Sequence, residues 1–350
     1  MRGTIYEFEQ GPRVAYAPAI SRPAFRPVPR NRAAPLIGII RNPRSHRNKG
    51  KPAEFAGRPD ILTRTPRTRA DLREELAEFA RRGIDYLVVD GGDGTVRDVL
   101  TCGEPVFADR WPKMVVLPKG KTNALAVDLG LPNVWSLADA LEAIAGGQTI
   151  ERRPLAVELP AGCGDNAERG LVQGFILGAG AFTKCTQAAQ QAHRRGAFNS
   201  FAVLLTIVWT LWQTLFGRIT NPMRAGIPMQ IALGRGELPL GDSGRGQRGR
   251  RFIVFASTLE QFPLGAKPFG RLRRGLKLTV LDAPLRRLVA LAPFVLAGFD
   301  PSGLQRLGLH RVVSDQVVLD LGDRFILDGE YFPAGRYVLR QGSPLRFVTP

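Results

Sequence analysis

Cysteine is scarce in this sequence. Only three of the 350 residues are cysteine, Cys102, Cys163 and Cys185, and they are too few and too scattered for a disulfide scaffold or a zinc site. The sequence therefore indicates a reducing, cytoplasmic setting. It also has no apolar stretch followed by a small-residue cleavage site near its beginning, so no secretory signal is expected there.

Acidic residues are outnumbered. The chain has 49 lysines and arginines against 31 aspartates and glutamates, which gives a formal net charge of +18. This excess favours an anionic partner: nucleic acid, a phosphate-rich ligand or an anionic membrane surface. Residues 1–33 repeat arginine and proline without an apolar period, and they are predicted to form a flexible basic arm rather than a transit peptide.

The rest of the chain is apolar enough to fold. Hydrophobic residues make up 44% of the sequence and charged residues 23%, which excludes global disorder, and 350 residues suffice for two hydrophobic cores. Between residues 34 and 152, apolar strands alternate with helices. This alternation predicts a nucleotide-binding α/β domain built on a doubly wound parallel sheet, in which ligands gather at the carboxyl ends of the strands.

After residue 152 the pattern becomes rich in short strands. They predict an antiparallel, β-sandwich-like domain over residues 153–335, and residues 336–350 are predicted to return toward the first domain. One helical exception is the uncharged segment 196–217, which is long enough to span a membrane. Polar residues form a stripe along it, so one face of this helix is expected to meet something other than lipid.

Three glycines surround one carboxylate in the segment "GGDGT". Gly91, Gly92 and Gly94 follow an apolar strand and precede a helix, and they would permit positive φ angles and a close approach of backbone N–H groups to a phosphate. Asp93 would order a magnesium ion or accept a proton, and Thr95 would cap the helix or reach a phosphate oxygen. The alternative is a tight strand-to-helix turn with a polar cap.

Four motifs together resemble one known family. "GGDGT" is preceded by "IIRNP", followed by "LPKGKTNALAVDLGLP" and later by "FILDGE". In this order they resemble the diacylglycerol kinase catalytic-domain family, which includes sphingosine and ceramide kinases. The resemblance covers roughly residues 36–348. It implies that the β-rich domain, residues 153–335, holds a lipid substrate, and it favours a buried or lipid-contacting helix over a membrane span for segment 196–217. "GGDGT" alone is shared with NAD kinases and phosphofructokinases, whose remaining motifs are not found in this sequence.

The resemblance implies ATP and Mg²⁺ as cofactors, with the metal reached by Asp93 through the nucleotide. It implies a nucleotide site made of Asn42, Pro43, Thr65, Gly91, Gly92, Asp93, Gly94, Thr95, Val96, Arg97, Asp98, Gly120, Lys121, Thr122 and Asn123. Lys121 stands where the family usually has threonine. In "RRGLKL", Arg274 stands where relatives carry a carboxylate that helps to hold an accessory magnesium ion.

The resemblance also implies the catalytic residues Asp328, Glu330 and Asp93, with Asp328 as the acceptor of the proton from a lipid hydroxyl. The residues themselves allow two interpretations. Two carboxylates two positions apart on a strand project to the same side and can share base chemistry and metal binding. Alternatively, Asp328 and Gly329 form no more than a hairpin turn.

The function expected from these observations is an ATP-dependent kinase of a lipid alcohol, with diacylglycerol preferred and a sphingoid base or ceramide as the alternative. Its expected partners are the lipid alcohol and, peripherally, an anionic membrane; no nucleic acid is expected, and a homodimer stays open. Two other hypotheses remain. One is a basic nucleic-acid-binding protein without catalysis, which the carboxylates oppose. The other is a kinase of a soluble polyol or dinucleotide.

Overall fold

The computed structural model describes residues 34–52, 58–160, 170–184, 186, 226–236, 238–244, 246–301 and 303–350. The predicted basic arm and the uncharged segment 196–217 lie outside the described residues. Within the described part of the chain, no helix is both long and apolar enough to cross a membrane.

A mixed sheet forms the first part of the fold, which we call the α/β part. Its strand order is β2 (Ile61–Arg64), β1 (Ile37–Arg41), β3 (Tyr86–Gly91), β4 (Lys113–Pro118), β19 (Leu345–Val348) and β5 (Thr149–Arg152). The first five strands run parallel, and only β5 is antiparallel to its neighbour β19. The last strand of the chain therefore completes a sheet that the N-terminal residues begin.

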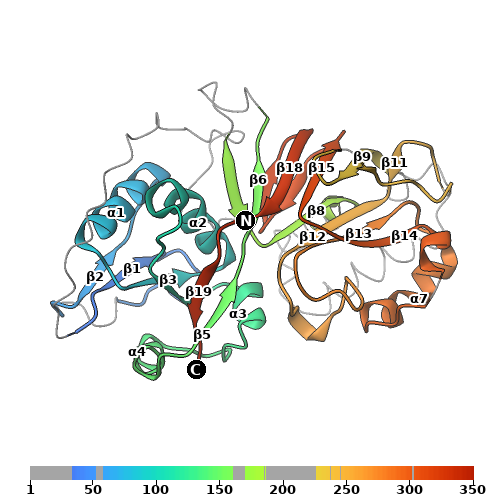
Figure 1. Cartoon of the computed structure of the whole chain (residues 1–350). Coiled ribbons are helices and arrows are strands. Elements are labelled where there is room, and N and C mark those ends of the chain that lie inside the picture. The colour runs from blue at the N-terminus through green and yellow to red at the C-terminus, as the bar shows by residue number, and fades with distance from the viewer. Residues whose placement is uncertain are drawn as a thin grey trace.

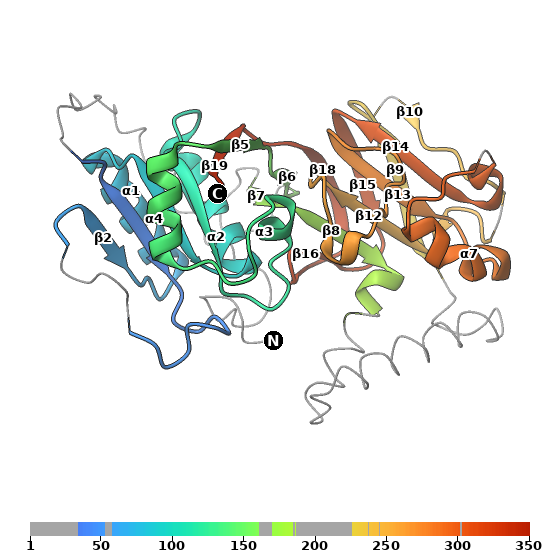
Figure 2. The same cartoon turned by 90° about the horizontal axis from the view of Figure 1, so that it is seen from below.

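Helices cover both faces of this sheet (Figures 1 and 2). α1 and α2 lie on one face and α4 on the other, and the short α3 lies toward the β-rich part. The bounds are α1 (Arg69–Arg82), α2 (Asp93–Phe107), α3 (Ala124–Asp128) and α4 (Leu137–Gly146). α1 begins with a reciprocal capping box between Thr68 and Asp71 and ends at Gly83, whose φ of 63° is left-handed. The predicted doubly wound arrangement is confirmed.

Two antiparallel sheets form the second part, which we call the β-sandwich. One has the order β10 (Leu238–Pro239), β9 (Ile227–Leu233), β15 (Gln316–Leu321), β18 (Gly335–Gln341), β6 (Leu155–Glu158) and β7 (Leu171–Gly174), and β11 (Arg250–Arg251) also pairs with β9. The other has the order β14 (Leu309–Ser314), β13 (Leu276–Leu281), β12 (Ile253–Ser257), β8 (Ile176–Gly180), β16 (Phe325–Leu327) and β17 (Glu330–Phe332). Apolar residues of both sheets form one buried core, which confirms the predicted sandwich.

The sandwich also carries a helix that the sequence analysis did not predict. α7 (Arg286–Leu296) packs Leu288 and Val295 onto a small separate cluster that contains Leu304 and Leu309. Two short 3₁₀ turns, Pro263–Gly265 and Leu304–Leu307, flank this region. The sequence analysis assigned no element to these residues, and Pro293 lies inside the helix, where proline is normally a helix-breaking signal.

Polar contacts hold the two parts together. On α2, the Thr101 hydroxyl accepts a 3.0 Å hydrogen bond from the backbone N–H of Gln173, which is on β7. At the end of α3, the Asp128 carboxylate accepts hydrogen bonds from the backbone N–H groups of Glu260 (2.6 Å) and Gln261 (2.7 Å) and pairs with Arg152 at 2.6 Å. These contacts fix the sandwich against α2 and against the end of α3.

Candidate functional site

Two glycine-containing loops touch at the carboxyl ends of β3 and β4. A Cβ atom added to Gly92 would lie 2.9 Å from the Cα of Gly120, and one added to Gly91 would lie 2.5 Å from the Thr95 side chain. Neither these glycines nor Gly94 has a positive φ. The prediction that they serve positive φ angles is therefore wrong, and at Gly91 and Gly92 the reason for glycine is the close approach of backbone and side chain.

The loop after β4 is closed by its own asparagine. Asn123 adopts a left-handed φ of 49°, and its side chain accepts a 2.8 Å hydrogen bond from the Gly120 N–H while donating to the Gly120 carbonyl at 3.1 Å. Lys121 and Thr122 are exposed at the tip of this loop. The ammonium of Lys121 is thus free to meet an incoming anion.

The loop after β1 joins the same place. The buried Asn42 donates from Nδ2 to the Thr95 hydroxyl at 3.0 Å, and its backbone N–H donates to the Asp90 carbonyl at 2.9 Å. Pro43 follows on the surface, and Thr65 is exposed directly after β2. The structure thus brings Asn42, Thr95 and Gly120 to one edge of the sheet, whereas Thr65 makes no hydrogen bond with them.

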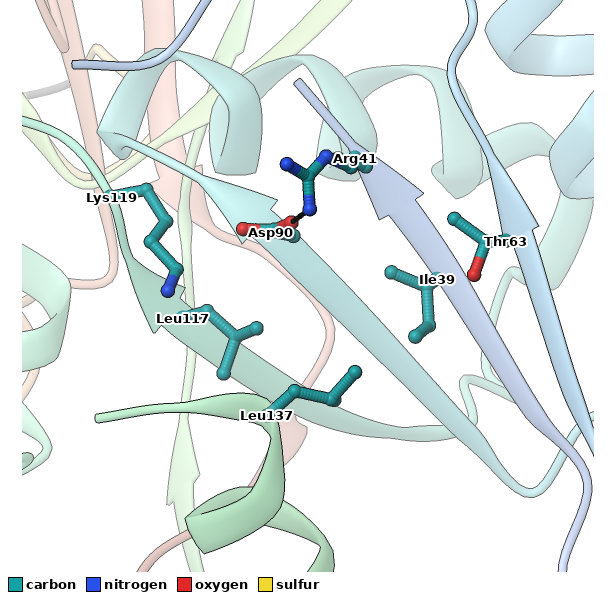
Figure 3. A pocket seen from close by; sticks show the side chains of 7 residues that line it. All are labelled: Ile39, Arg41, Thr63, Asp90, Leu117, Lys119 and Leu137. Carbon is teal, nitrogen blue, oxygen red and sulfur yellow. Dashed lines mark hydrogen bonds and ion pairs between the residues drawn. The ribbon is translucent and has the colours of Figure 1, made fainter. Parts of the chain in front are cut away.

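A small pocket lies beside these loops, on the sheet face that α4 covers (Figure 3). Arg41 and Asp90 form a buried ion pair of 3.2 Å at one side of it, and Lys119 lies at the other side. Its cavity volume is only about 10 Å³, and it is lined by Ile39, Arg41, Thr63, Asp90, Leu117, Lys119 and Leu137. Two cationic side chains therefore stand at the strand ends where an anionic ligand would bind.

The carboxylate of Asp93 connects the two glycine-containing loops. It accepts hydrogen bonds from the backbone N–H groups of Ala124 (3.1 Å) and Leu125 (3.4 Å), so it caps the start of α3. Burial raises the pKa of Asp93, although these N–H groups oppose the shift. No group of three or more potential acidic, histidine or cysteine ligands occurs among the described residues. Asp93 therefore holds the two loops in place.

Asp328 lies in the turn of a two-residue hairpin between β16 and β17. Asp328 and Gly329 both have positive φ angles, 44° and 85°, as a type I′ turn requires. The interpretation that Asp328 and Glu330 alternate along one strand is therefore wrong. Turn geometry is also not the whole account, because the Asp328 carboxylate accepts two backbone hydrogen bonds, from Phe175 at 2.8 Å and Ile176 at 2.9 Å.

The position of Asp328 gives its carboxyl group an unusual pKa. Burial and, second to it, the negative charge of Asp93 raise the pKa of Asp328 to about 7, against the opposing effects of the two N–H groups and Arg97. Gly174 makes room for this carboxylate, since an added Cβ would lie 2.6 Å from Asp328 Oδ2. The influence of Asp93 means that the glycine loop of the α/β part and the hairpin of the sandwich meet at one place.

Glu330 has a different environment. Its Oε2 pairs with the guanidinium of Arg97 at 2.7 Å and with that of Arg69 at 3.2 Å, and Asp98 pairs with the same two arginines at 2.9 and 2.8 Å. Burial raises the pKa of Glu330, while Arg97 and Arg69 counteract this effect. Burial lowers the pKa of Arg97, but Asp98 and Glu330 outweigh it and hold that pKa above its usual value. We call these four residues the arginine cluster.

The arginine cluster also bears on the predicted triphosphate loop. Val96, Arg97 and Asp98 are buried within α2, which begins at Asp93, so the loop itself is shorter than the predicted stretch from Gly91 to Asp98. Arg97 also donates from Nη1 to the carbonyl of Leu327, at 3.4 Å. It therefore holds the residue before Asp328 as well as Glu330, the residue that follows the turn.

Basic side chains lie where relatives carry the carboxylate of an accessory metal site. Arg274 is exposed, and the nearby Lys277 is buried with its ammonium donating to the carbonyls of Arg273 (2.8 Å) and Gly275 (3.3 Å). Burial lowers the pKa of Lys277 to about 8. An ammonium group thus satisfies backbone carbonyls here, where no carboxylate of the segment 271–277 is available for a cation.

Sequence reasoning missed three contributors to the site: Arg69, Lys119 and Gly174. Arg69 was interpreted only as part of a helix, and its partner Glu330 lies 261 positions away in the sequence. Gly174 belongs to a strand-rich stretch, and nothing near it in the sequence indicates that it contacts Asp328 in the fold. For Lys119 the sequence does offer a signal, a lysine directly after a parallel strand, because anions gather at that end of the sheet.

The chain is similar to known kinases in sequence and in fold. Residues 39–157 match the family model described as the diacylglycerol kinase catalytic domain. Among curated proteins, none matches the chain. The match includes Asn42, the "GGDGT" segment and the loop from Gly120 to Asn123, so the α/β part is similar to the catalytic domain of these kinases.

Solved structures with the same fold are also found. A diacylglycerol kinase from Bacillus anthracis strain Sterne is 16% identical, with a TM-score of 0.55, and the match covers 90% of this chain and 97% of that chain. A candidate diacylglycerol kinase from the same strain is 17% identical, with a TM-score of 0.60 and the same coverage. At these identities the similarity shows the fold of both parts and leaves the substrate to the chemistry of the site.

Proposed function

We propose, from the kinase domain matched by residues 39–157, that this protein transfers the γ-phosphoryl group of ATP to the hydroxyl of a lipid alcohol, with diacylglycerol as the preferred substrate. The observation that carries the proposal is the position of Asp328. Its carboxyl group lies close enough to Asp93 of the glycine loop to feel its charge, and it has a pKa of about 7. A base poised near the working pH is what hydroxyl deprotonation needs.

The chemistry of phosphoryl transfer fits the groups that converge here. Such reactions depend mainly on positioning and on neutralising the charge of the transferred group. The backbone of the two glycine-containing loops would lie against the phosphates, and Lys119 and Lys121 would contribute positive charge. Asp328 would accept the proton of the lipid hydroxyl as the oxygen attacks phosphorus, and ADP would leave.

Magnesium would arrive as part of the nucleotide substrate. Two carboxylates, Asp93 and Asp328, lie close enough together to influence each other, and hard oxygen donors suit Mg²⁺. Because backbone N–H groups already contact both carboxylates, the ion would be held chiefly by phosphate oxygens. In this role Mg²⁺ supplies charge neutralisation, while the residues of the chain orient the phosphates and the hydroxyl.

A lipid alcohol is preferred over a soluble acceptor for two reasons. The solved structures of similar fold include a diacylglycerol kinase, and the chain's net charge of +18 suits an anionic membrane surface. Sphingoid bases and ceramide present the same primary hydroxyl, so they are the alternative substrates. We also propose that the protein associates peripherally with membranes in the cytoplasm. A role in nucleic-acid binding is disfavoured, because Asp93 and Asp328 would repel a polyanion at this edge.

The test is a transfer assay with γ-labelled ATP and Mg²⁺. Diacylglycerol, monoacylglycerol, sphingosine and ceramide are presented separately in anionic vesicles, with glycerol and NAD as soluble acceptors, and the labelled product is identified. We expect label in one lipid alcohol and none in the soluble acceptors. Label in glycerol or NAD alone, or salt-sensitive DNA binding without any transfer, would reject the proposal.

A further inference from the structure

Lys277 places a positive charge inside the protein. It is the second residue of β13, and it is only 1% exposed. Its ammonium group donates hydrogen bonds to the carbonyl oxygens of Arg273 (2.8 Å) and Gly275 (3.3 Å), and it lies 5.7 Å from the centre of the Phe269 ring. The ammonium group is thus held by its own loop and by the negative face of an aromatic ring.

Two carboxylates lie close enough to act on this charge. Burial lowers the pKa of Lys277 to about 8, while the negative charges of Glu260 and Asp128 oppose the lowering. Arg152 pairs with both acids, with nitrogen–oxygen distances of 2.6 Å to Asp128 and 3.6 Å to Glu260. We call these four residues the junction cluster. Two acids meet two bases in it, and loss of the Lys277 charge would leave it with a net negative charge.

The junction cluster lies where the sandwich meets α3. Asp128 is the last residue of α3, and its carboxylate accepts hydrogen bonds from the backbone N–H groups of Glu260 and Gln261 of the sandwich. α3 begins next to the glycine-containing loops, because the Asp93 carboxylate caps its start. The charge of Lys277 therefore stabilises one end of a helix whose other end is fixed to the candidate site.

The same place does not suit a metal ion. Carbonyl and carboxylate oxygens are the donors that Mg²⁺ prefers, but here the carbonyls of Arg273 and Gly275 already accept hydrogen bonds from an ammonium group. Arg274, which is exposed beside them, stands where the family resemblance implies a carboxylate ligand. A divalent cation would have to displace the ammonium group of Lys277, and the positive charges of Lys277 and Arg274 would repel it.

We propose that the Lys277 ammonium group is the built-in cation of the junction between α3 and the sandwich, and that it replaces the accessory metal ion implied by the family resemblance. The lysine supplies the positive charge that the carbonyl oxygens and the two acids need, and its attachment to the chain avoids the entropic cost of binding a free ion. The inference goes beyond the proposed function, because it concerns a cation held in the fold and can be tested without transfer of phosphate.

The test is chemical rescue of Lys277→Ala in the full-length chain. The substitution removes the ammonium group with most of its alkyl stem, a fragment of the size of n-propylammonium. We expect the melting temperature to fall by about 4 °C or more. n-Propylammonium at about 50 mM should restore about half of that loss or more, by binding to the folded state. n-Propanol at the same concentration fills the same space without a charge, and it should restore little.

Lys267→Ala is the matched control for the rescue. This lysine is exposed in the same region, so its replacement should leave the melting temperature near that of the wild type, with or without the amine. A wild-type melting temperature for Lys277→Ala would overturn the inference. Equal restoration by n-propanol and n-propylammonium, or none by either, would also overturn it, because packing of the alkyl stem would then account for the loss.

A second measurement tests the replacement of the metal ion. Mg²⁺ at about 5 mM exceeds the dissociation constants of even weak protein sites for hard divalent cations. Without nucleotide, it should leave the wild-type melting temperature within about 1 °C of the value in EDTA, because the ammonium group already fills the place. A larger rise that Asp328→Asn also shows would reveal a metal ion away from the reaction centre and would overturn the inference. Failure of the proposed function would be seen separately, in the transfer assay.

Discussion

The two acids of the β16–β17 hairpin lie two positions apart in opposite surroundings. Asp328 meets only backbone N–H groups as hydrogen-bond donors, and burial brings its pKa to about 7. Glu330 meets two arginines and forms ion pairs with both. One carboxyl group is thus poised to exchange a proton near neutral pH, whereas the other is fixed in an ionic cluster.

Asp328 and Glu330 are therefore expected to have different roles. Neutral N–H donors position a carboxylate without stabilising its charge as a cation does, so desolvation prevails at Asp328. Guanidinium groups stabilise the charge of Glu330 and join it to α1 and α2 of the α/β part. Chemistry is therefore expected at Asp328, and the geometry that supports it is expected to depend on the arginine cluster.

The largest effect is expected at Asp328. Replacement by Asn (Asp328→Asn) removes the proton acceptor and should lower phosphoryl transfer by about 1,000-fold, measured as the rate of labelled lipid formation. Asp320→Asn, at an exposed position of β15, is the matched control and should retain wild-type transfer. Substantial transfer by the Asp328→Asn protein would remove Asp328 from the mechanism.

The second-largest loss of phosphoryl transfer is expected at Asp93. Asp93→Ala removes the carboxylate that joins the two glycine-containing loops, and transfer should fall by about 100-fold because the phosphates lose their fixed cradle. It should also cost about 1 kcal/mol of stability through the lost cap of α3. Asp139→Ala breaks the corresponding cap of α4 and should cost a similar free energy without loss of transfer, as checked by thermal unfolding and the transfer assay. Equal loss of transfer in both variants would mean that Asp93 acts through stability alone.

The arginine cluster should matter mainly for stability. Arg97→Met leaves the buried carboxylates of Asp98 and Glu330 to share Arg69, which lies 2.8 and 3.2 Å from them. The free energy of unfolding should therefore fall by about 3 kcal/mol, as measured by urea titration. The surface control Arg81→Met breaks an exposed pair with Glu78 and should cost less than about 1 kcal/mol. Similar losses of unfolding free energy in both variants would show that the buried arginine cluster stabilises the fold no more than an exposed ion pair does.

A smaller effect concerns stability and pH. The folded-state pKa of Asp328, about 7, lies above the ordinary value of 3.8, so the native state holds this proton more tightly than the unfolded chain does. Wild-type stability should therefore fall as pH rises from about 4 to 7 through this group, and Asp328→Asn should remove that loss. The variant should gain about 1 to 3 kcal/mol relative to the wild type between pH 5 and pH 8, as measured by urea unfolding. A constant difference across this range would contradict the raised pKa.

Much of this architecture could be predicted from the sequence because its signals are local. The capping residues Thr68 and Asp71 and the alternation of strands with helices define α1 and the parallel sheet without knowledge of distant contacts. The family motifs likewise identified Asn42, Gly91 to Thr95 and Asp328 as residues worth testing, and the structure brings Asp93 and Asp328 within electrostatic reach of each other.

The rest depended on contacts between distant segments. Nothing near Arg69 in the sequence indicates that it pairs with Glu330, and the need for glycine at Gly92 arises from Gly120 on another loop. The environment that separates Asp328 from Glu330 is likewise tertiary, because it comes from β8 on one side and from α1 and α2 on the other. Short motifs identify Asp328 and Glu330 as candidate site residues, but their pKa values depend on contacts that form only in the folded protein.

The pH dependence of lipid phosphorylation tests the central claim most directly. With ATP, Mg²⁺ and the best lipid alcohol, kcat/KM should rise about tenfold per pH unit below pH 7 and level off above it, because the deprotonated form of Asp328 is the active one. Glu330→Gln should leave the position of this limb near pH 7 while lowering its height. A rate that stays constant from pH 5.5 to 8 would contradict the assignment of Asp328 as the proton acceptor.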